Sequence, residues 1–235
     1  MIVIVLGMHR SGTSAISGIL HENGINMGKV LYPPPMKENP KGFYESKHFR
    51  DINDRILNFN AYKVKAFSPN IPDPIHLQLG HTELMQSRLR EYSDEFENWG
   101  WKDPRTSLLI EHWLEIMKQM NLFDQVKMIY MHRNPRDIAQ SMKNRGNKEK
   151  TPGQFVKVAI AYQEACVPKL LLHKDKTCFI AFEYLMVYPE RELKKVSDFL
   201  GYDLKDISFV DPLIPKTRGQ NNEGSFIPEN AAASQ

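Results

Sequence analysis

A glycine-bracketed loop after the first apolar segment carries groups that bind anions. Residues 3–14 read VIVLGMHRSGTS, in which four residues separate Gly7 from Gly12. Between a strand and a helix, such a loop aims backbone N–H groups and the positive end of the helix dipole at one point. Three hydroxyl groups add further donors: Ser11, Thr13 and Ser14. We expect an anion to bind here, the alternative being a plain tight turn.

The same loop lacks the lysine of nucleoside-triphosphate hydrolases. Thr13 occupies the position after the second glycine, where that lysine reaches the terminal phosphates. The cation stands inside the turn at Arg10, from which it can reach a bridging oxygen near the 5′ end of a nucleotide. The apolar segment VKMIYMH is followed by Arg133 and Asn134 rather than by an acidic ligand for Mg²⁺. We therefore expect a bound nucleotide and no metal requirement.

A second segment, RNPRDIAQSM, places an arginine and a serine where both can face one phosphate. Arg133 follows a predicted strand, and Ser141 comes eight residues later, in the second turn of the predicted helix. A guanidinium and a hydroxyl together suit a phosphate group. Taken alone, the segment also fits a capped helix start with a solvated arginine.

Together the two segments resemble the sulfotransferases that use 3′-phosphoadenosine 5′-phosphosulfate (PAPS), in their bacterial and phage-type branch. HRSGTS is similar to that family's 5′-phosphosulfate loop, and RNPRDIAQSM is similar to its 3′-phosphate motif. Three more segments carry the resemblance, which spans roughly residues 1–201: NPKGFYE, WGWKDPRTS and FEYLMVYPERELKKVSDFLG. It implies a P-loop NTPase-like α/β fold, PAPS as the sulfonate donor and adenosine 3′,5′-bisphosphate (PAP) as the product.

The resemblance also implies which residues bind the donor. They are His9, Arg10, Ser11, Gly12, Thr13, Ser14, Arg133 and Ser141. A tail segment, TRG, is similar to the basic Arg-Lys-Gly segment of cytosolic members and adds Arg218 and Gly219. It departs from that pattern because Thr217 replaces a basic residue.

In-line sulfonate transfer needs a cation at the leaving oxygen, a base for the acceptor proton and a second donor at the sulfonate. Arg10 is the expected cation, and its role must be electrostatic because arginine keeps its proton. Glu45 is the expected base, by similarity to a glutamate of tyrosylprotein and heparan-type enzymes, if burial raises its pKa. Lys102 is the expected third group, by similarity to a Lys-Asp-Pro of tyrosylprotein sulfotransferases. We expect Asp103 and Arg105 to pair with each other.

Each of these assignments has a plainer alternative. Glu45 also suits the first turn of a helix as a solvated acid, and Lys102 suits a surface position beside two tryptophans. His9, His48 and His76 are rival bases, because cytosolic small-molecule sulfotransferases use a histidine. Three aromatic residues, Phe43, Trp99 and Trp101, either stack on adenine, line the acceptor pocket or belong to the core.

Strands and helices alternate along the chain, which predicts a parallel sheet with helices on both faces. Four apolar segments predict strands: MIVIVL, WGWKDP, VKMIYMH and TCFIAF. Amphipathic spacing predicts intervening helices, with Ser46 and Thr106 as N-caps and Gly24 and Gly201 at helix ends. The irregular segments 29–43 and 63–77 are expected to wall the acceptor site.

The composition fits one α/β domain over residues 1–235. Hydrophobic residues make up 41% and charged residues 25% of the sequence, and the formal net charge of +3 is too small to indicate a nucleic-acid partner. Cys166 and Cys178 lack metal-ligand spacing, so a reducing compartment is expected. The six-residue apolar start is too short for a membrane span or a signal peptide. We expect a cytoplasmic protein, provided that no anchor precedes this sequence.

The function expected from these features is transfer of a sulfonate group from PAPS to a hydroxyl or amine acceptor. The acceptor class, whether a small molecule, a carbohydrate or a peptide, does not follow from the sequence. A small-molecule kinase with a P-loop is one alternative, and the missing loop lysine speaks against it. The other is a nucleotide-binding protein without catalytic activity.

Overall fold

The structure is a computed structural model that describes residues 1–32, 41–146 and 150–206. Its centre is a parallel sheet with the strand order β2-β1-β3-β4. The strands are β1 (Ile2–Leu6), β2 (Trp99–Lys102), β3 (Val126–His132) and β4 (Thr177–Ala181). Because all the pairings are parallel, the carboxyl ends of the strands meet at one edge of the sheet.

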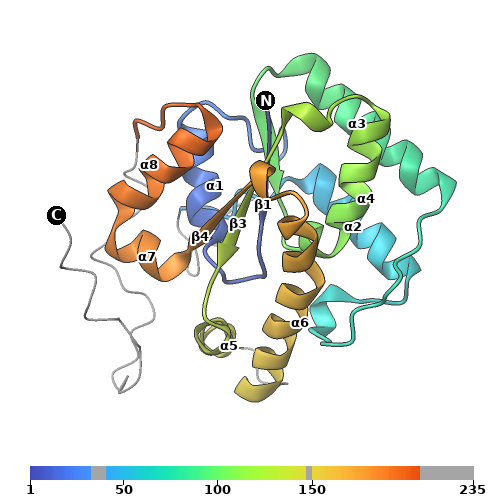
Figure 1. The fold of residues 1–235 in the computed structure, drawn as a ribbon. Helices are drawn as coiled ribbons and strands as arrows, with labels where there is room; N and C mark the ends of the chain where they lie inside the picture. The colour runs from blue at the N-terminus through green and yellow to red at the C-terminus, as the bar shows by residue number, and fades with distance from the viewer. Residues whose placement is uncertain (33–40, 147–149, 207–235) are drawn as a thin grey trace.

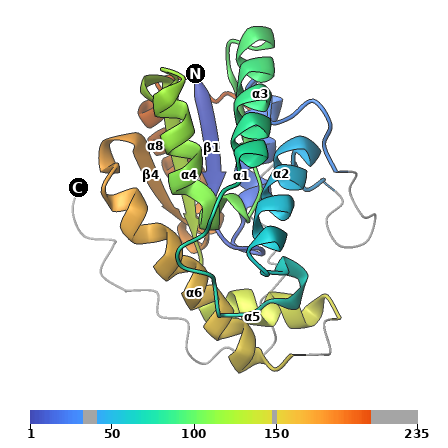
Figure 2. The same cartoon turned by 90° about the vertical axis from the view of Figure 1, so that its right-hand side faces the viewer.

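Helices cover both faces of the sheet, as the alternation along the sequence predicts. The helices are α1 (Thr13–Glu22), α2 (Lys47–Phe59), α3 (Leu79–Glu95), α4 (Thr106–Gln119), α5 (Pro135–Asn144), α6 (Pro152–Leu171), α7 (Phe182–Val187) and α8 (Pro189–Leu200). Short 3₁₀ helices are η1 (Val64–Ala66), η2 (Phe123–Gln125) and η3 (Lys174–Lys176). Helices α1, α7 and α8 lie on one side of the sheet, and α2, α3, α4 and α6 lie on the other (Figures 1 and 2). None of the described helices combines the length and apolar composition needed to cross a bilayer.

Strand β1 explains why the sheet needs both layers. All five of its residues are fully buried, and their side chains alternate between the two faces. Ile2, Ile4 and Leu6 join the core beneath α2, α4 and α6. Val3 and Val5 join the core beneath α1 and α8. A central strand with no polar face is typical of parallel sheets.

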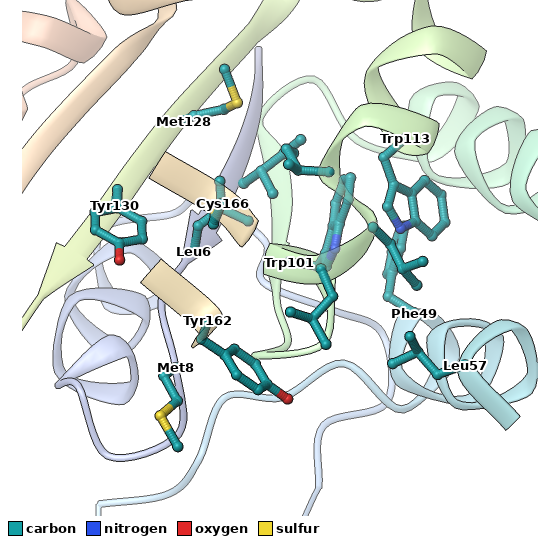
Figure 3. Packing of buried hydrophobic residues seen from close by; sticks show 14 of the residues in the cluster. Leu6, Met8, Phe49, Leu57, Trp101, Trp113, Met128, Tyr130, Tyr162 and Cys166 are labelled. Carbon is teal, nitrogen blue, oxygen red and sulfur yellow. The ribbon is translucent and has the colours of Figure 1, made fainter. Parts of the chain in front are cut away.

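The larger core contains the tryptophans of β2. Phe49 of α2 stacks on Trp101 with ring centroids 4.2 Å apart, and Trp113 of α4 lies 5.1 Å from Trp101 (Figure 3). Trp99 and Trp101 are 1% and 0% exposed. Of the alternatives open for these two residues, the core assignment is therefore correct, and the stacking or pocket-lining assignments are wrong.

The helix boundaries differ from the expected ones where tertiary contacts compete with local capping. Ser46 is the N-cap of α2, but its hydroxyl lies 3.4 Å from the Tyr92 hydroxyl and makes no capping hydrogen bond. The predicted cap at Thr106 is wrong, because this residue is the first of α4 and its Oγ1 accepts hydrogen bonds from Asn53 and Trp101. Gly201 ends α8 in the left-handed conformation, as predicted. Helix α7, six residues long, was not predicted.

Candidate active site

The segments that carry the predicted site converge at the carboxyl edge of the sheet. Lys102, the last residue of β2, pairs in register with Val5 of β1, two residues before the loop begins at Gly7. Strand β3 leads directly into Arg133 and α5, which lies below the sheet at this edge in both views (Figures 1 and 2). The parallel topology thus brings together three motifs that are far apart in the sequence.

The loop after β1 is shaped by its own hydrogen bonds. The Gly7 amide donates to the Ser107 hydroxyl over 2.9 Å, which fixes the start of the loop to α4. The Ser11 hydroxyl donates to the Met8 carbonyl over 2.7 Å. The hydroxyl proton of Ser11, which was expected to bind an anion, is therefore used for a hydrogen bond within the loop.

The beginning of α1 supplies the amide donors that an anion needs. The backbone N–H groups of Gly12, Thr13 and Ser14 have no carbonyl partner in the described ranges. The first amides of a helix lack intrahelical acceptors, and the helix dipole adds positive potential at the same place. These amides fit a phosphate or sulfonate group.

Gly12 is required at this junction for two reasons. Its φ is +93°, and a Cβ placed on it would lie 2.2 Å from the Phe182 ring. We expect Gly12→Ala to lower the free energy of unfolding by about 1–3 kcal/mol, because the new Cβ would clash with the Phe182 ring and alanine is strained in the left-handed conformation. Urea unfolding measures this. Gly80→Ala is the matched control, since a Cβ there meets nothing within 4 Å, and it should stabilise α3 by less than about 1 kcal/mol. Equal effects at the two positions would contradict the prediction.

Arg10 connects the loop to the second predicted phosphate site. Its Nε donates to the Ser141 hydroxyl over 2.9 Å, and its carbonyl accepts from Arg133 Nη1 over 2.9 Å. Arg10 itself has a φ of +70°, so the backbone turns here in a conformation that is uncommon outside glycine. The two motifs that the sequence separates by more than a hundred residues therefore lie in direct contact.

Two residues at this junction were not predicted. The Phe182 ring lies under the Arg133 guanidinium, 4.3 Å from the ring centroid to Cζ, and also abuts Gly12. The Glu183 carboxylate accepts a hydrogen bond from the Asn134 amide over 3.0 Å. A signal for both residues was present in the sequence, because Phe182 ends an apolar predicted strand and Glu183 directly follows it. The carboxyl ends of parallel strands lie at the same edge of the sheet, so residues at this position can reach the site.

Lys102 and Glu45 form a buried ion pair beside the loop. Lys102 Nζ lies 3.0 Å from Glu45 Oε1 and 3.4 Å from Ser14 Oγ. The Lys102 side chain is 2% exposed and the Glu45 side chain is 15% exposed. The alternatives of a surface lysine and a solvated glutamate are therefore wrong. The ammonium lies between a carboxylate and the first turn of α1.

The charges around Glu45 keep it ionised. Burial by itself would raise the pKa of Glu45, but the Lys102 ammonium, together with His9 and Arg105, lowers it to about 2. Burial lowers the pKa of Lys102, and Glu45 counteracts part of that change. The raised pKa that a general base at Glu45 requires is not found in this state, because the ion pair outweighs the desolvation.

His9 is turned into the protein beside the same ion pair. Its ring contacts Phe67 and Tyr162, with centroids 5.7 and 6.5 Å away. Burial, reinforced by the nearby Arg105 charge, lowers the pKa of His9 to about 3. Its Nε2 atom is buried and has no hydrogen-bond partner within the described part of the chain. A neutral imidazole with an unpaired nitrogen fits a site that receives a further polar group.

The expected pair of Asp103 and Arg105 is confirmed. Arg105 Nη1 donates to Asp103 Oδ1 over 2.7 Å, and its Nε donates to Asp54 over 2.5 Å. Asn53 completes the arrangement by donating to Asp103 Oδ2 over 2.8 Å and accepting from Trp113. These contacts brace the turn that follows Lys102.

The remaining candidates lie elsewhere. His48 faces α3, where its Nδ1 lies 3.2 Å from the Tyr92 hydroxyl, and His76 is exposed in the segment after α2. Phe43 is half-buried against Arg145. Arg218 and Gly219 lie outside the described residues, as does part of the segment 29–43. Among the described residues, no three histidine, cysteine or acidic side chains form a group that could hold a metal ion.

Solved structures share this fold. The sulfotransferase domain from the curacin biosynthetic pathway has a TM-score of 0.51 at 18% identity, covering 90% of this chain and 77% of that one. The sulfotransferase domain of the Synechococcus PCC 7002 olefin synthase has a TM-score of 0.52 at 19% identity, covering 91% of this chain and 77% of that one. A sulfotransferase from Alicyclobacillus acidocaldarius has a TM-score of 0.52 at 15% identity, covering 90% of this chain and 84% of that one. These likenesses concern the fold.

Comparison at the level of sequence gives the family. A search of curated proteins found no significant match. A sequence model of the sulfotransferase family matches residues 3–206, a range that contains the loop after β1, the Lys102–Glu45 pair and the start of α5. With this match over most of its length, on a fold shared with solved sulfotransferases, the chain belongs to the sulfotransferase family.

Proposed function

We propose that this protein transfers a sulfonate group from PAPS to a hydroxyl or amine acceptor. The observation that carries the proposal is the contact of Arg10 with both Ser141 and Arg133. This contact brings the loop before α1 next to the Arg133 guanidinium, which precedes α5, and the Ser141 hydroxyl within α5. Two adjacent anion sites joined by one arginine suit a nucleotide with a phosphate at each end.

The loop and α5 divide the donor between them. The amides of Gly12, Thr13 and Ser14 hold the 5′-phosphosulfate, and Arg133 and Ser141 hold the 3′-phosphate. The unpaired His9 Nε2 is available for a further hydrogen bond with a group bound at the same edge. Arg218 and Gly219 complete the donor site by resemblance alone.

Three residues act on the transferring group. Arg10 stabilises the charge that develops on the 5′-phosphate as the bridging S–O bond breaks and its electron pair stays with the phosphate. Glu45 accepts the proton of the acceptor as the new bond to sulfur forms. Lys102 donates a hydrogen bond to an equatorial sulfonate oxygen from its position 3.4 Å from Ser14 Oγ. No metal is needed, because the cations of Arg10 and Lys102 neutralise the charge on the transferring group.

The acceptor enters beside Glu45. Phe67 of segment 63–77 contacts His9, so this segment reaches the candidate site, as expected of an acceptor wall. Phe67 also packs on Phe155 of α6, with centroids 5.8 Å apart. The wall is aromatic on this side, and a small molecule, a sugar or a peptide side chain remains compatible with it.

Binding of PAP tests the donor assignment. We expect Arg133→Ala to weaken PAP binding by about 10–100-fold, because a hydrogen bond to a charged group contributes about 1.5–3 kcal/mol. Isothermal titration calorimetry measures this, and adenosine 5′-phosphate, which lacks the 3′-phosphate, should bind both forms alike. Arg136→Ala, an exposed arginine of α5, is the matched control.

Two outcomes would contradict the donor assignment. One is an Arg133→Ala effect no larger than that of Arg136→Ala. The other is wild-type protein that binds magnesium-ATP and ignores PAP, which would favour a small-molecule kinase. Binding of PAP without any sulfonate transfer in an acceptor screen would instead indicate a nucleotide-binding protein without catalytic activity.

A further inference from the structure

Lys102 has two hydrogen-bond partners in the candidate active site, Glu45 and Ser14. Its Nζ donates to Glu45 over 3.0 Å and to Ser14 over 3.4 Å. An ammonium carries three N–H groups, and the described residues use two of them. Ser14 belongs to the first turn of α1, where the donor's charged end is proposed to lie. A sulfonate bound at that place would lie within reach of the same ammonium.

We propose that Glu45 and the donor's sulfonate compete for Lys102, so that only the donor-bound enzyme holds a carboxylate free to take the acceptor's proton. This inference rests on the proposed function and adds to it a mechanism by which donor binding controls the basicity of Glu45. In the structure Glu45 is paired with Lys102. The incoming sulfonate draws the ammonium toward Ser14, and Glu45 loses part of its counter-charge.

The surroundings of Glu45 make this competition consequential. Lys102 from the end of β2 and Arg105 from the turn after Lys102 both act on it electrostatically, and the neutral His9 ring lies nearby. Asp103 is the nearby acid, and Arg105 neutralises it. Because His9 is neutral and Arg105 is already held by two carboxylates, Lys102 is the one cation of this group paired with Glu45 through a hydrogen bond.

Loss of the Lys102 contact strengthens Glu45 as a base. The pair holds the pKa of Glu45 at about 2, and a carboxylate that weak takes a proton from an alcohol poorly. A negative sulfonate nearby adds repulsion, and burial is then opposed less strongly, so both changes raise that pKa. At neutral pH the freed carboxylate stays ionised and becomes a better acceptor of the proton.

The proton balance of the step is simple. The acceptor oxygen or nitrogen bonds to sulfur and gives its proton to the Glu45 carboxylate. The bridging S–O bond breaks, and its electron pair leaves on the 5′-phosphate of PAP. When the sulfonated product departs, Lys102 returns to Glu45, whose lowered proton affinity sends the proton to solvent.

Proton uptake on binding the donor tests this proposal. Titrating PAPS into the protein at about pH 5.5, in two buffers with different ionisation enthalpies, gives the number of protons bound. We expect wild-type protein to take up as much as about one proton more than Glu45→Gln, whose amide oxygen still accepts from Lys102. Glu83→Gln, an exposed glutamate of α3, should behave as wild type. PAP, which lacks the sulfonate, should give no uptake that depends on Glu45.

The outcomes separate this inference from the function beneath it. PAPS binding with equal proton uptake by wild type and Glu45→Gln overturns the competition and leaves the donor assignment intact, and so does Glu45-dependent uptake with PAP. Wild-type protein that binds neither nucleotide overturns both. If Glu45→Gln does not fold, infrared difference spectra of the wild type decide: PAPS, but not PAP, should produce a protonated-carboxyl band at pH 5.5, and its absence overturns the proposal.

Discussion

Replacing Arg10 by alanine is expected to lower kcat for sulfonate transfer by about 10²–10³-fold, with a much smaller change in PAP affinity. In the structure the Arg10 Nε donates to the Ser141 hydroxyl. In the proposed reaction the guanidinium faces charge that grows only as the S–O bond breaks. Such an interaction lowers the barrier more than it strengthens binding. Labelled PAPS with an acceptor found by screening measures kcat, and calorimetry measures PAP affinity.

Two variants make the test of Arg10 specific. Arg10→Lys keeps the charge but loses the planar fork, so it should recover only part of the rate. Arg136→Ala removes an exposed arginine of α5 and should keep kcat. The φ of +70° at position 10 is equally demanding for alanine and arginine, so backbone strain does not explain a difference. If Arg10→Ala kept kcat within about twofold, an electrostatic role in the transition state would be ruled out.

Arg105→Ala is expected to lower the free energy of unfolding by about 3–5 kcal/mol, because it leaves a buried carboxylate without its counter-charge. Asp103 is 0% exposed, and among the described residues its carboxylate would keep only the Asn53 hydrogen bond. Urea unfolding near pH 8 measures the effect. Lys47→Ala is the matched control, since its pair with Asp51 is more than half exposed and should contribute less than about 1 kcal/mol.

The effect of Arg105→Ala should depend on pH with a definite sign. Burial raises the pKa of Asp103, and Arg105 opposes that change. Without Arg105 the pKa rises further, so the folded variant binds a proton more readily than the unfolded chain, and its stability deficit shrinks as the pH falls. Arg105→Ala/Asp103→Asn should recover stability at pH 8 relative to Arg105→Ala alone. A deficit equal to that of Lys47→Ala, or one that grows on acidification, would contradict this account.

Several misses share one cause. The cap predicted at Thr106, the open alternatives for Trp101 and the unpredicted Phe182 contact all depend on neighbours from other elements. Threonine is a residue type that often caps helices, but the Thr106 hydroxyl already accepts hydrogen bonds from Asn53 and Trp101. Local preference predicts what a residue can do in a short segment, and tertiary contacts override it when they offer a buried partner.

The strands, most of the helices and the two candidate anion-binding motifs could be predicted from the sequence, because these depend on hydrophobic periodicity and on glycine and helix-terminal amides a few residues apart. The pairing of Lys102 with Glu45, 57 positions away, and the desolvation that keeps His9 neutral are visible only in the folded chain. The physical reason is that proton affinities follow from burial and from distances between charges. Those distances exist only once the parallel strands have brought their carboxyl ends to one edge of the sheet.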